Sequence, residues 1–538
     1  MKREFRRLEE GPFDLLVVGG GIYGAWAACD AALRGLRVAI VERTDWAAGT
    51  SSASSKLVHG GLRYLEHLWL LLVRKTLTER NRLSRLGPHR VRPIRFVLPV
   101  YRGDRRGRRI LGAGLSLYDA LSPAGGPVAA HRPLSPEEIL SLCPFLDGED
   151  LVGGLEYGDC LTDDARFTLE VVAGAIEAGA VAVNHAEAVS FLRSRNGVSG
   201  ARIRDGEGGS MAEVRASVVL GAAGPWLDGL LDRKGDRRLD RASKGVHLVF
   251  PPLPSERAIL LTARSDGRPI FLIPWYGRTL LGTTDTEFLG RPDEVRVESE
   301  DVDYLISEAN HALAGRPFRE SDVLGCTAGV RSLRSGGARA SPALSREWVL
   351  LEPIARLLVS VGGKLTSARA DASRALDRVQ RILGRPPCSS PTEDRPFAWR
   401  PEGPLDEWLP EHARRGELLG LDPETARAAA LRYGSTLPLL HDILRASPEF
   451  AARIDRSLPF CLAEVVHAAR NEMAVTLADV LRRRIPLSIL GRVHAETVVE
   501  CARLVGDELS WSPERRESEI VQLLERCLAA PSVHEKTL

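Results

Sequence analysis

The feature that most constrains the fold lies near the start of the chain, where FDLLVV (13–18) is followed by GGGIYG, AWAACDAALRGL and RVAIVE. The two apolar segments predict parallel strands joined by a helix, a β-α-β unit of about thirty residues. Gly19, Gly21 and Gly24 fit the Gly-x-Gly-x-x-Gly pattern, and Glu42 ends the second strand. These glycines let the backbone approach a pyrophosphate, and the acid can bind a ribose. The unit therefore predicts a dinucleotide-binding domain.

Apolar runs further along the chain predict the remaining strands. VAVNHAEAVSF (181–191) and VVLGAAGPW (218–226) favour strands of the first sheet, with GEGG (206–209) as a hairpin turn between them. LLVSVGG (357–363) predicts one more strand, leading into a helix. GVHLVF, FLIPWYG and LLGTTD, which all begin within 245–283, favour antiparallel strands of a second sheet suited to a substrate.

These elements predict an α/β + α protein with three domains. A Rossmann-type domain would comprise 1–95, 155–240 and 345–383, and a substrate domain 96–154 and 241–344. The composition of GRPPCSSPTEDRP indicates a linker, placed at 384–399. Beyond it, 400–538 predicts an all-helical domain, which we interpret as structural or dimerising, so a homodimer is one expected assembly.

The net charge of +2 conceals a basic region. Between Arg63 and Arg109, fourteen Arg and Lys residues stand against three acids, a local charge of +11. Apolar residues follow the charges within 105–121, as in an interfacial element, so this region predicts contact with an anionic membrane surface. Nucleic acid is not an expected partner, because aromatic residues are not interleaved with the basic ones.

The cysteines and the N-terminus limit the classes of protein. Eight cysteines are scattered singly without Cys-x-x-Cys spacing, which argues against zinc, iron–sulfur and disulfide scaffolds, so we expect no metal. MKREFRRLEE carries charges where a signal peptide would be apolar, and no apolar run reaches the about eighteen residues of a membrane span. We therefore expect the chain to be cytoplasmic.

A set of further motifs follows the first glycine motif, and the most distinctive is the segment SKLVHGGLRYLEH (55–67). The whole set, in chain order, is DLLVVGGGIYGA, TSSASSKLVHGGLRYLEH, YGDCLTDDARFTLE, GAAGPW, KGVHLVF, IPWYGRTLLGTTDTEF, AGVRSL, VGGKLTSAR and NEMAVTLADVLRRR. With these motifs the chain resembles the FAD-dependent (respiratory, aerobic-type) glycerol-3-phosphate dehydrogenase family over nearly its whole length. Ser332, Ala223 and Val246 depart from the residues usual in that family.

The resemblance implies a glutathione-reductase/D-amino-acid-oxidase-like fold whose Rossmann-type domain binds FAD. It implies oxidation of sn-glycerol 3-phosphate to dihydroxyacetone phosphate, with a hydride passing to flavin N5 and electrons passing to membrane quinone. A protein of this kind would associate peripherally with the inner face of the cell membrane. The cofactor is expected to contact Gly19, Gly21, Gly24, Glu42, Thr50, Ser51, Ser54, Ser55, Lys56, His59, Gly224, Gly362, Gly363, Lys364 and Thr366.

The substrate that the resemblance implies is a dianion, so its binding residues should be cationic. Guanidinium forks suit phosphate, which selects Arg63, Arg331 and Arg346, with Tyr64 beside Arg63. Lys364 follows two glycines at an expected helix start, where its charge would favour reduced flavin and also bind substrate.

Two histidines are candidates for the catalytic base. Histidine has the side-chain pKa nearest to working pH, and we favour His247 over His59. His247 would otherwise be a core histidine, and His59 a residue packed under the flavin ring. Arg331 could stabilise the developing alkoxide.

Two other activities fit the same residues. An oxidase of the same fold would return electrons to dioxygen. An amino-acid oxidase or deaminase would share the first glycine motif, and its carboxylate substrate would explain the arginines equally well.

Overall fold

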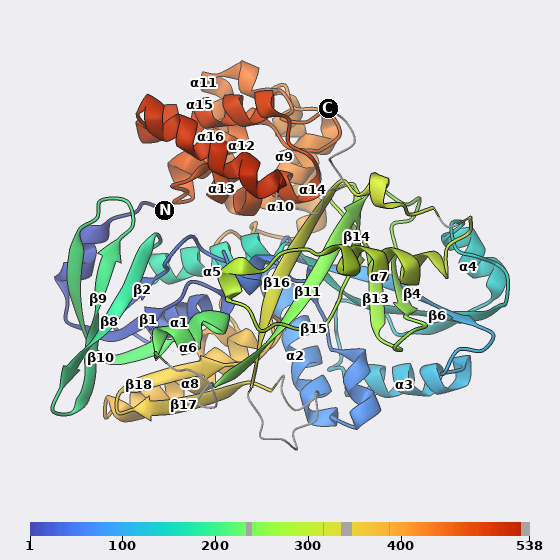
Figure 1. Ribbon diagram of the computed structural model, residues 1–538, viewed down its shortest axis with the longest axis horizontal. Coiled ribbons are helices and arrows are strands. Elements are labelled where there is room, and N and C mark those ends of the chain that lie inside the picture. Colours follow the sequence, from blue (N-terminus) through green and yellow to red (C-terminus); the bar gives the residue numbers. More distant parts are fainter. Residues whose placement is uncertain (233–238, 316, 335–346, 387, 529–538) are drawn as a thin grey trace.

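The computed structural model describes residues 1–232, 239–315, 317–334, 347–386 and 388–528. Figure 1 shows a first sheet on the left, a second sheet on the right and the C-terminal helices gathered above them. This architecture confirms the predicted α/β + α class.

The first sheet has the strand order β17-β18-β10-β1-β2-β7, with β8 and β9 added through β10. Its strands are β1 (Phe13–Val18), β2 (Val38–Val41), β7 (Val181–Val183), β8 (Ala186–Ser194), β9 (Gly197–Asp205), β10 (Met211–Gly221), β17 (Val349–Ile354) and β18 (Leu357–Val361). β1 pairs in parallel with β2 and β10, and β18 extends the parallel set. The predicted hairpin turn at 206–209 is confirmed, since it joins the antiparallel β9 and β10.

Three helices cover one face of this sheet: α1 (Ile22–Leu33), α5 (Asp164–Glu177) and α8 (Ala368–Ile382). α1 is rich in alanine and buries nearly all its residues, because small side chains let it pack closely between the sheet and its two neighbours. Trp26 fills the remaining space and meets the ring of Phe167 edge-on at 6.2 Å.

The second sheet has the order β15-β11-β14-β13-β12-β4-β6-β3, with β16 on β11 and β5 on β6. Its strands are β3 (Leu57–Val58), β4 (Val91–Tyr101), β5 (Arg132–Leu134), β6 (Leu151–Thr162), β11 (Asp240–Phe250), β12 (Ala258–Thr262), β13 (Pro269–Trp275), β14 (Arg278–Gly282), β15 (Thr286–Glu287) and β16 (Gly325–Arg334). The predicted antiparallel strands within 245–283 are β11, β13 and β14. Four helices accompany the sheet: α2 (Leu70–Leu86), α3 (Arg108–Leu121), α4 (Pro136–Leu142) and α7 (Ser299–Asn310).

Two long strands cross the predicted domain boundaries. β4 runs across 95/96 and β6 across 154/155, because the two pair with each other along almost their whole length. The segment 384–399, predicted as a linker, is packed against the first domain: Phe397 stacks on Phe167 at 5.3 Å, and Trp399 N donates to Glu170 Oε1 at 2.9 Å.

The C-terminal domain is helical, as predicted. Its helices are α9 (Leu405–Glu417), α10 (Pro423–Tyr433), α11 (Leu437–Ala446), α12 (Leu462–Asn471), α13 (Leu477–Asp479), α14 (Leu487–Leu490), α15 (Ala495–Leu509) and α16 (Pro513–Leu528). A π-helical turn, η12 (Val480–Arg484), follows α13. Arg166 on α5 donates to both carboxylate oxygens of Glu472, at 2.6 and 2.9 Å, so a buried ion pair joins this domain to the first.

Across the described part of the chain, no helix is both long and apolar enough to cross a membrane.

Candidate active site

A cavity of about 2180 Å³ lies where the two sheets and the C-terminal domain meet. Its walls come from the ends of β1 and β2, the segment 48–66, strands β11 and β16, the loop 360–366 and the C-terminal residues 476–494. Nearly all the residues predicted for cofactor and substrate border this one space.

The dinucleotide motif forms one end of the cavity. Gly19 has φ of +116°, and a Cβ on it would lie 2.6 Å from the carbonyl oxygen of Ala222. A Cβ on Gly24 would lie 1.9 Å from Gly19 O, so this glycine lets α1 pack against β1. Gly21 differs, since its nearest obstacle is Ser51 Oγ at 3.1 Å and its bare backbone faces the cavity. The space left by Gly21 is therefore space for a ligand.

Glu42 stands at the end of β2 and borders the cavity. Its carboxylate accepts the backbone N–H groups of Gly20 at 2.6 Å and Thr44 at 2.9 Å. These bonds hold the carboxylate beside the glycine turn, where a ribose hydroxyl could donate to it.

The segment 50–55 borders the cavity with small polar side chains. Thr50 donates to Val330 O, and Ser51 Oγ accepts the N–H of Ile22 at 2.9 Å. Ser54 Oγ donates to Asp164 Oδ2 at 2.6 Å, which anchors the segment to α5. Thr50, Ser51, Ser54 and Ser55 border the cavity, and their contact with the cofactor stays a prediction.

Lys56 does not lie where the sequence predicted it. Its ammonium is buried between Asp164 Oδ1 at 2.6 Å and Ser52 O at 2.7 Å, and lies 4.8 Å from the ring of Trp275. The prediction that Lys56 lines the cofactor site is wrong, because a buried carboxylate draws the side chain away from the cavity. Lys56 instead fastens the segment 50–56 to α5.

The glycines before α8 border the cavity opposite His59. Gly362 and Gly363 have φ of +72° and +97°, and a Cβ on Gly363 would lie 1.8 Å from the hydroxyl oxygen of Tyr23. Thr366 Oγ1 accepts the N–H of His59 at 3.1 Å, and burial lowers the pKa of the His59 ring to about 4. Gly224, with φ of +52°, lines the same cavity from the turn after β10.

Lys364 lies in a turn, and α8 begins only at Ala368. The prediction that Lys364 starts the helix is therefore wrong by about one turn. Its Nζ has no hydrogen-bond partner among the described residues and sits 3.5 Å above the ring of Tyr64. Burial, followed by repulsion from Arg63, lowers the pKa of Lys364 to about 7. An unpaired cation in a cavity is suited to bind an anion.

Arg331 on β16 is held by oxygen atoms of the second sheet. Its guanidinium donates to Thr283 Oγ1 at 2.8 Å, Thr284 O at 3.1 Å and Lys244 O at 3.2 Å, and it lies 3.4 Å from Asp285 Oδ1. These contacts fix the plane of the guanidinium at the cavity wall.

Arg63 completes the cationic end of the cavity, with its guanidinium 5.2 Å from the ring centre of Tyr64. Arg63, Tyr64, Arg331 and Lys364, which the sequence predicted from distant motifs, thus border the same cavity. Arg346 lies outside the described residues.

His247 on β11 is 2% exposed, and its Nε2 lies 2.8 Å from Ser55 Oγ. Its Nδ1 has no hydrogen-bond partner among the described residues. Burial, and next the positive charge of Arg331, lower the pKa of His247 to about 3. The imidazole is therefore neutral at working pH, and in this environment it holds a proton only weakly.

The comparisons with known proteins agree with this geometry. Residues 14–382 match the family model described as FAD dependent oxidoreductase, and residues 404–516 match the C-terminal domain of alpha-glycerophosphate oxidase. The chain is 36% identical to glycerol-3-phosphate dehydrogenase 2 of Mycobacterium bovis, over 97% of this chain and 89% of the relative. The chain belongs to the FAD-dependent glycerol-3-phosphate dehydrogenase family.

Other members of this family are similar over most of their length. Glycerol-3-phosphate dehydrogenase of Synechocystis is 33% identical over 96% of this chain and 97% of the relative. The solved structure of glycerol-3-phosphate dehydrogenase from Bacillus halodurans, complexed with FAD, has a TM-score of 0.80 and 29% identity, covering 99% of this chain and 98% of that one.

FAD is the cofactor of this glycerol-3-phosphate dehydrogenase family member, as predicted. The described residues fit it. Gly21 leaves bare backbone at the N-terminus of α1, and Glu42 follows it by about twenty residues, the spacing at which an acid binds the ribose. Lys364 brings an amino group without a hydrogen-bond partner among the described residues to the same cavity.

Several residues that shape this site were not predicted from the sequence. A Cβ on Gly245 would lie 2.1 Å from Arg331 Nη2, and one on Gly282 would lie 2.2 Å from the His247 ring. Glycines inside strands were the signal that could have identified them, since they mark close approach. Tyr23, which accepts the N–H of Lys364 at 2.9 Å, carried no such signal.

Proposed function

We propose that this chain oxidises sn-glycerol 3-phosphate to dihydroxyacetone phosphate. The observation that carries the proposal is the meeting of Arg63, Arg331 and Lys364 with a neutral histidine, His247, in one cavity. The names of the relatives point to the same substrate. A phosphate dianion needs several cations, and a secondary alcohol needs a base, and both are present here.

The three cations would divide the work of binding phosphate. Arg331 is prealigned by Thr283 and the carbonyl of Thr284, so it loses little freedom on binding. The Lys364 ammonium has no hydrogen-bond partner among the described residues, so it can donate to the phosphate without breaking an existing bond. Tyr64 lies under Lys364 and beside Arg63, which keeps both cations over one ring.

The reaction removes a hydride from C2 of the substrate and a proton from its hydroxyl. When bound, FAD supplies the hydride acceptor, the flavin N5. His247 Nε2 is our candidate to accept the proton, with Ser55 Oγ giving way or relaying it. His59 is the second candidate, since burial keeps it neutral too.

We further propose membrane quinone as the electron acceptor and peripheral docking of a cytoplasmic protein to the inner face of the cell membrane. An apolar crest supports this: Leu68, Leu71 and Ile110 are 75%, 86% and 65% exposed. They belong to the neighbouring elements η3 (Leu62–His67) with its C-cap, α2 and α3, at the lower edge of Figure 1. Exposed large apolar side chains grouped in this way favour an interface.

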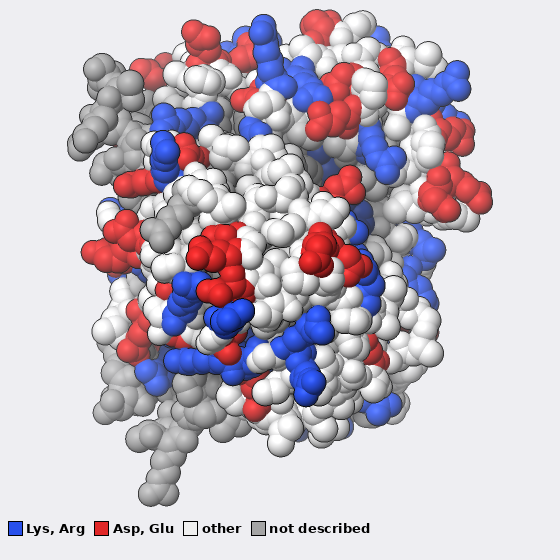
Figure 2. All heavy atoms as spheres, turned by 90° about the vertical axis from the view of Figure 1, so that its right-hand side faces the viewer, with Lys and Arg blue, Asp and Glu red and all other residues white. Residues whose placement is uncertain are grey.

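The basic region between Arg63 and Arg109 has fewer unpaired cations to offer a membrane than its fourteen Arg and Lys residues indicate. Eight of its fourteen cations pair with acids, among them Arg80 with Asp159 and Arg90 with Glu170. Arg74, Arg105, Arg108 and Arg109 are exposed and have no acidic partner among the described residues. Figure 2 shows charges of both signs interspersed over the face that carries α3 and α4, with uncharged areas between them. Electrostatic attraction to lipid would therefore come from these four arginines beside the crest.

One wall of the cavity is suited to an apolar acceptor. Leu98, Tyr157, Leu260 and Phe271 of the second sheet border the cavity, together with Leu111 of α3. Glycerol 3-phosphate is too polar to gain from contact with these apolar side chains, whereas a quinone ring would pack against them favourably. Leu111 follows the exposed Ile110, so this wall and the crest share α3.

The decisive experiment is anaerobic titration of purified protein with glycerol 3-phosphate, followed by absorbance of the flavin. Bleaching supports the substrate. Reoxidation that is fast with a short-chain quinone and slow with air supports the quinone acceptor, and the reverse would identify a dioxygen-using oxidase. A flavin that bleaches with a D-amino acid instead would refute the substrate.

A further inference from the structure

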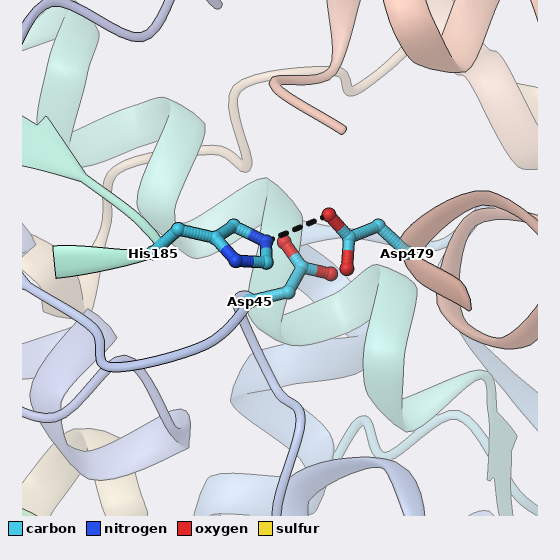
Figure 3. Close-up of side chains that lie close together, drawn as sticks. All are labelled: Asp45, His185 and Asp479. Carbon is cyan, nitrogen blue, oxygen red and sulfur yellow. Dashed lines mark hydrogen bonds and ion pairs between the residues drawn. The ribbon is translucent and has the colours of Figure 1, made fainter. Parts of the chain in front are cut away.

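Three ionisable side chains meet where the C-terminal domain touches the first sheet (Figure 3). Asp45 follows β2, His185 lies between β7 and β8, and Asp479 ends α13. Each offers a ligand-type atom within 4.8 Å of the other two. Because this spacing is also that of a metal site, the existing partners of the three side chains decide their role.

The carboxylates of this group are already paired with arginine. Asp45 accepts Arg483 Nε at 2.6 Å and Arg484 Nη2 at 2.9 Å. Asp479 pairs with Arg483 and lies 2.9 Å from His185 Nε2. Two guanidinium groups therefore balance two buried carboxylates, and a metal cation would have to displace them. The group is an ion-pair network.

His185 borders the FAD cavity from the turn between β7 and β8. Asp45 does not border it but is buried next to Thr44, which, like Glu42, does. Backbone hydrogen bonds tie the two segments together, from His185 N to Thr44 O at 2.5 Å and from Ala186 N to Glu42 O at 2.7 Å. A displacement of either side chain would therefore shift Glu42.

The partners on the C-terminal side come from one short stretch. Asp479 precedes the π-helical turn Val480–Arg484, which presents Arg483 and Arg484 to Asp45. Arg482, in the same turn, borders the cavity itself. π-helical turns are rare and often occur at functional sites.

We propose that this turn of the C-terminal domain holds the ribose end of the FAD site in place. Arg483 and Arg484 fix Asp45, and Asp479 fixes His185, so all five are positioning residues for the cofactor. The helical domain, which bears no catalytic side chain in our assignment, thereby acts in FAD retention. The inference depends on FAD binding alone and is independent of the proposed substrate and acceptor.

The test measures release of FAD from purified holoprotein after dilution, with free flavin filtered off over time and folding followed by circular dichroism. Asp45→Asn should release FAD about tenfold faster than the parent, because a neutral amide no longer balances Arg483 and Arg484. His185→Gln should change the rate in the same direction by a smaller factor, since it loses only the contact with Asp479.

Arg470→Gln is the matched control, because it breaks an arginine–carboxylate pair with Glu508 inside the C-terminal domain that does not reach the first sheet. It should release FAD at the parental rate. A folded Asp45→Asn or His185→Gln protein that keeps FAD as long as the parent would overturn the proposal. If Asp45→Asn does not fold, His185→Gln decides alone. Equal acceleration by Arg470→Gln would also overturn the proposal, since the effect would then come from general loosening of the domain.

Discussion

Burial lowers the pKa of two titratable side chains that border the same cavity, the proposed base His247 and the proposed phosphate-binding residue Lys364. His247 has its pKa lowered to about 3 by burial and then by Arg331, so it stays neutral across the physiological range. Lys364 has its pKa lowered to about 7 by burial and then by Arg63, so its ammonium and its neutral amine are both populated near neutral pH. The same desolvation keeps the histidine neutral but makes it a weak base, whose pKa the negative charge of a bound phosphate would raise, and it makes the charge of the lysine sensitive to pH.

The pH dependence of kcat/KM follows from these directions. In the proposed site, phosphate is bound by the Lys364 ammonium, which is present below its lowered pKa and is lost as pH rises through about 7. Lys364→Arg should move this alkaline limb out of the measurable range, because guanidinium does not deprotonate. The acid limb, from the second phosphate ionisation near pH about 6, should be common to both proteins. Identical alkaline limbs in parent and variant would assign that limb to another group.

Arg331→Lys tests the grip on phosphate. The variant keeps the charge but loses the planar fork. The fall in kcat/KM for glycerol 3-phosphate should therefore correspond to a loss of about 2 kcal/mol or more in transition-state stabilisation. Glycerol, which lacks the phosphate, should be a poor substrate of the parent and should lose far less. An equal loss on both substrates would mean that Arg331 acts at C2 or through its contacts with Thr283 and Thr284.

At single residues, the sequence predicted side-chain type better than side-chain direction. Arg63 and Lys56 lie in one motif, and both were expected at the ligand site. Arg63 borders the cavity, whereas Lys56 turns inward to Asp164, more than a hundred residues away in the chain. That pairing depends on α5 lying behind the segment, which a local pattern does not reveal.

Among the secondary-structure elements, the glycines of the first β-α-β unit have separate tasks. Gly24 admits the packing of α1 on β1, whereas Gly21 leaves room at the cavity. Motif spacing predicted the unit itself, since the period of the apolar residues changes from strand to helix within it. Motif spacing could not predict that β4 pairs with β6 across the expected domain boundaries, because the register between distant strands has no local signature in the sequence.

The two glycines give opposite predictions for alanine. Gly21 has φ of −74° and ψ of 179°, which alanine adopts freely, so Gly21→Ala should fold with an apoprotein Tm near that of the parent but bind FAD weakly. Gly24→Ala places a methyl group 1.9 Å from Gly19 O and should lower the Tm or prevent folding. Thermal unfolding of apoprotein and flavin content after reconstitution measure both effects. Full FAD content in Gly21→Ala would show that the pyrophosphate lies elsewhere.

Across the whole molecule, the C-terminal domain and the apolar crest lie at opposite edges. The C-terminal domain covers one side of the cavity, and the apolar crest around α2 and α3 lies at the opposite edge in Figure 1. The helical character of the tail was predictable from composition and period. Its contact with the FAD cavity was not, because Arg483, paired with Asp479, reaches Asp45 more than four hundred residues away in the chain, and such a contact has no local signature.

Docking of the crest to lipid can be divided into an electrostatic and an apolar part. Replacing Arg74, Arg105, Arg108 and Arg109 with Gln should reduce pelleting with anionic vesicles at low salt, and the parent should approach the variant as salt screens the charges. Replacing Leu68, Leu71 and Ile110 with Ser should reduce pelleting at every salt concentration, because buried apolar area is not screened.

Both variants should keep parental turnover of glycerol 3-phosphate with a soluble dye, since none of these side chains borders the cavity. With a quinone embedded in vesicles, both should be slower than the parent, because the acceptor is reached only from the bilayer. Arg202→Gln is the control, since it removes an exposed arginine from β9, on the first sheet and far along the chain from the crest. Parental pelleting by the Leu/Ile variant would exclude the crest as the lipid-binding surface, and a dye rate lowered in parallel with the quinone rate would point to a damaged fold.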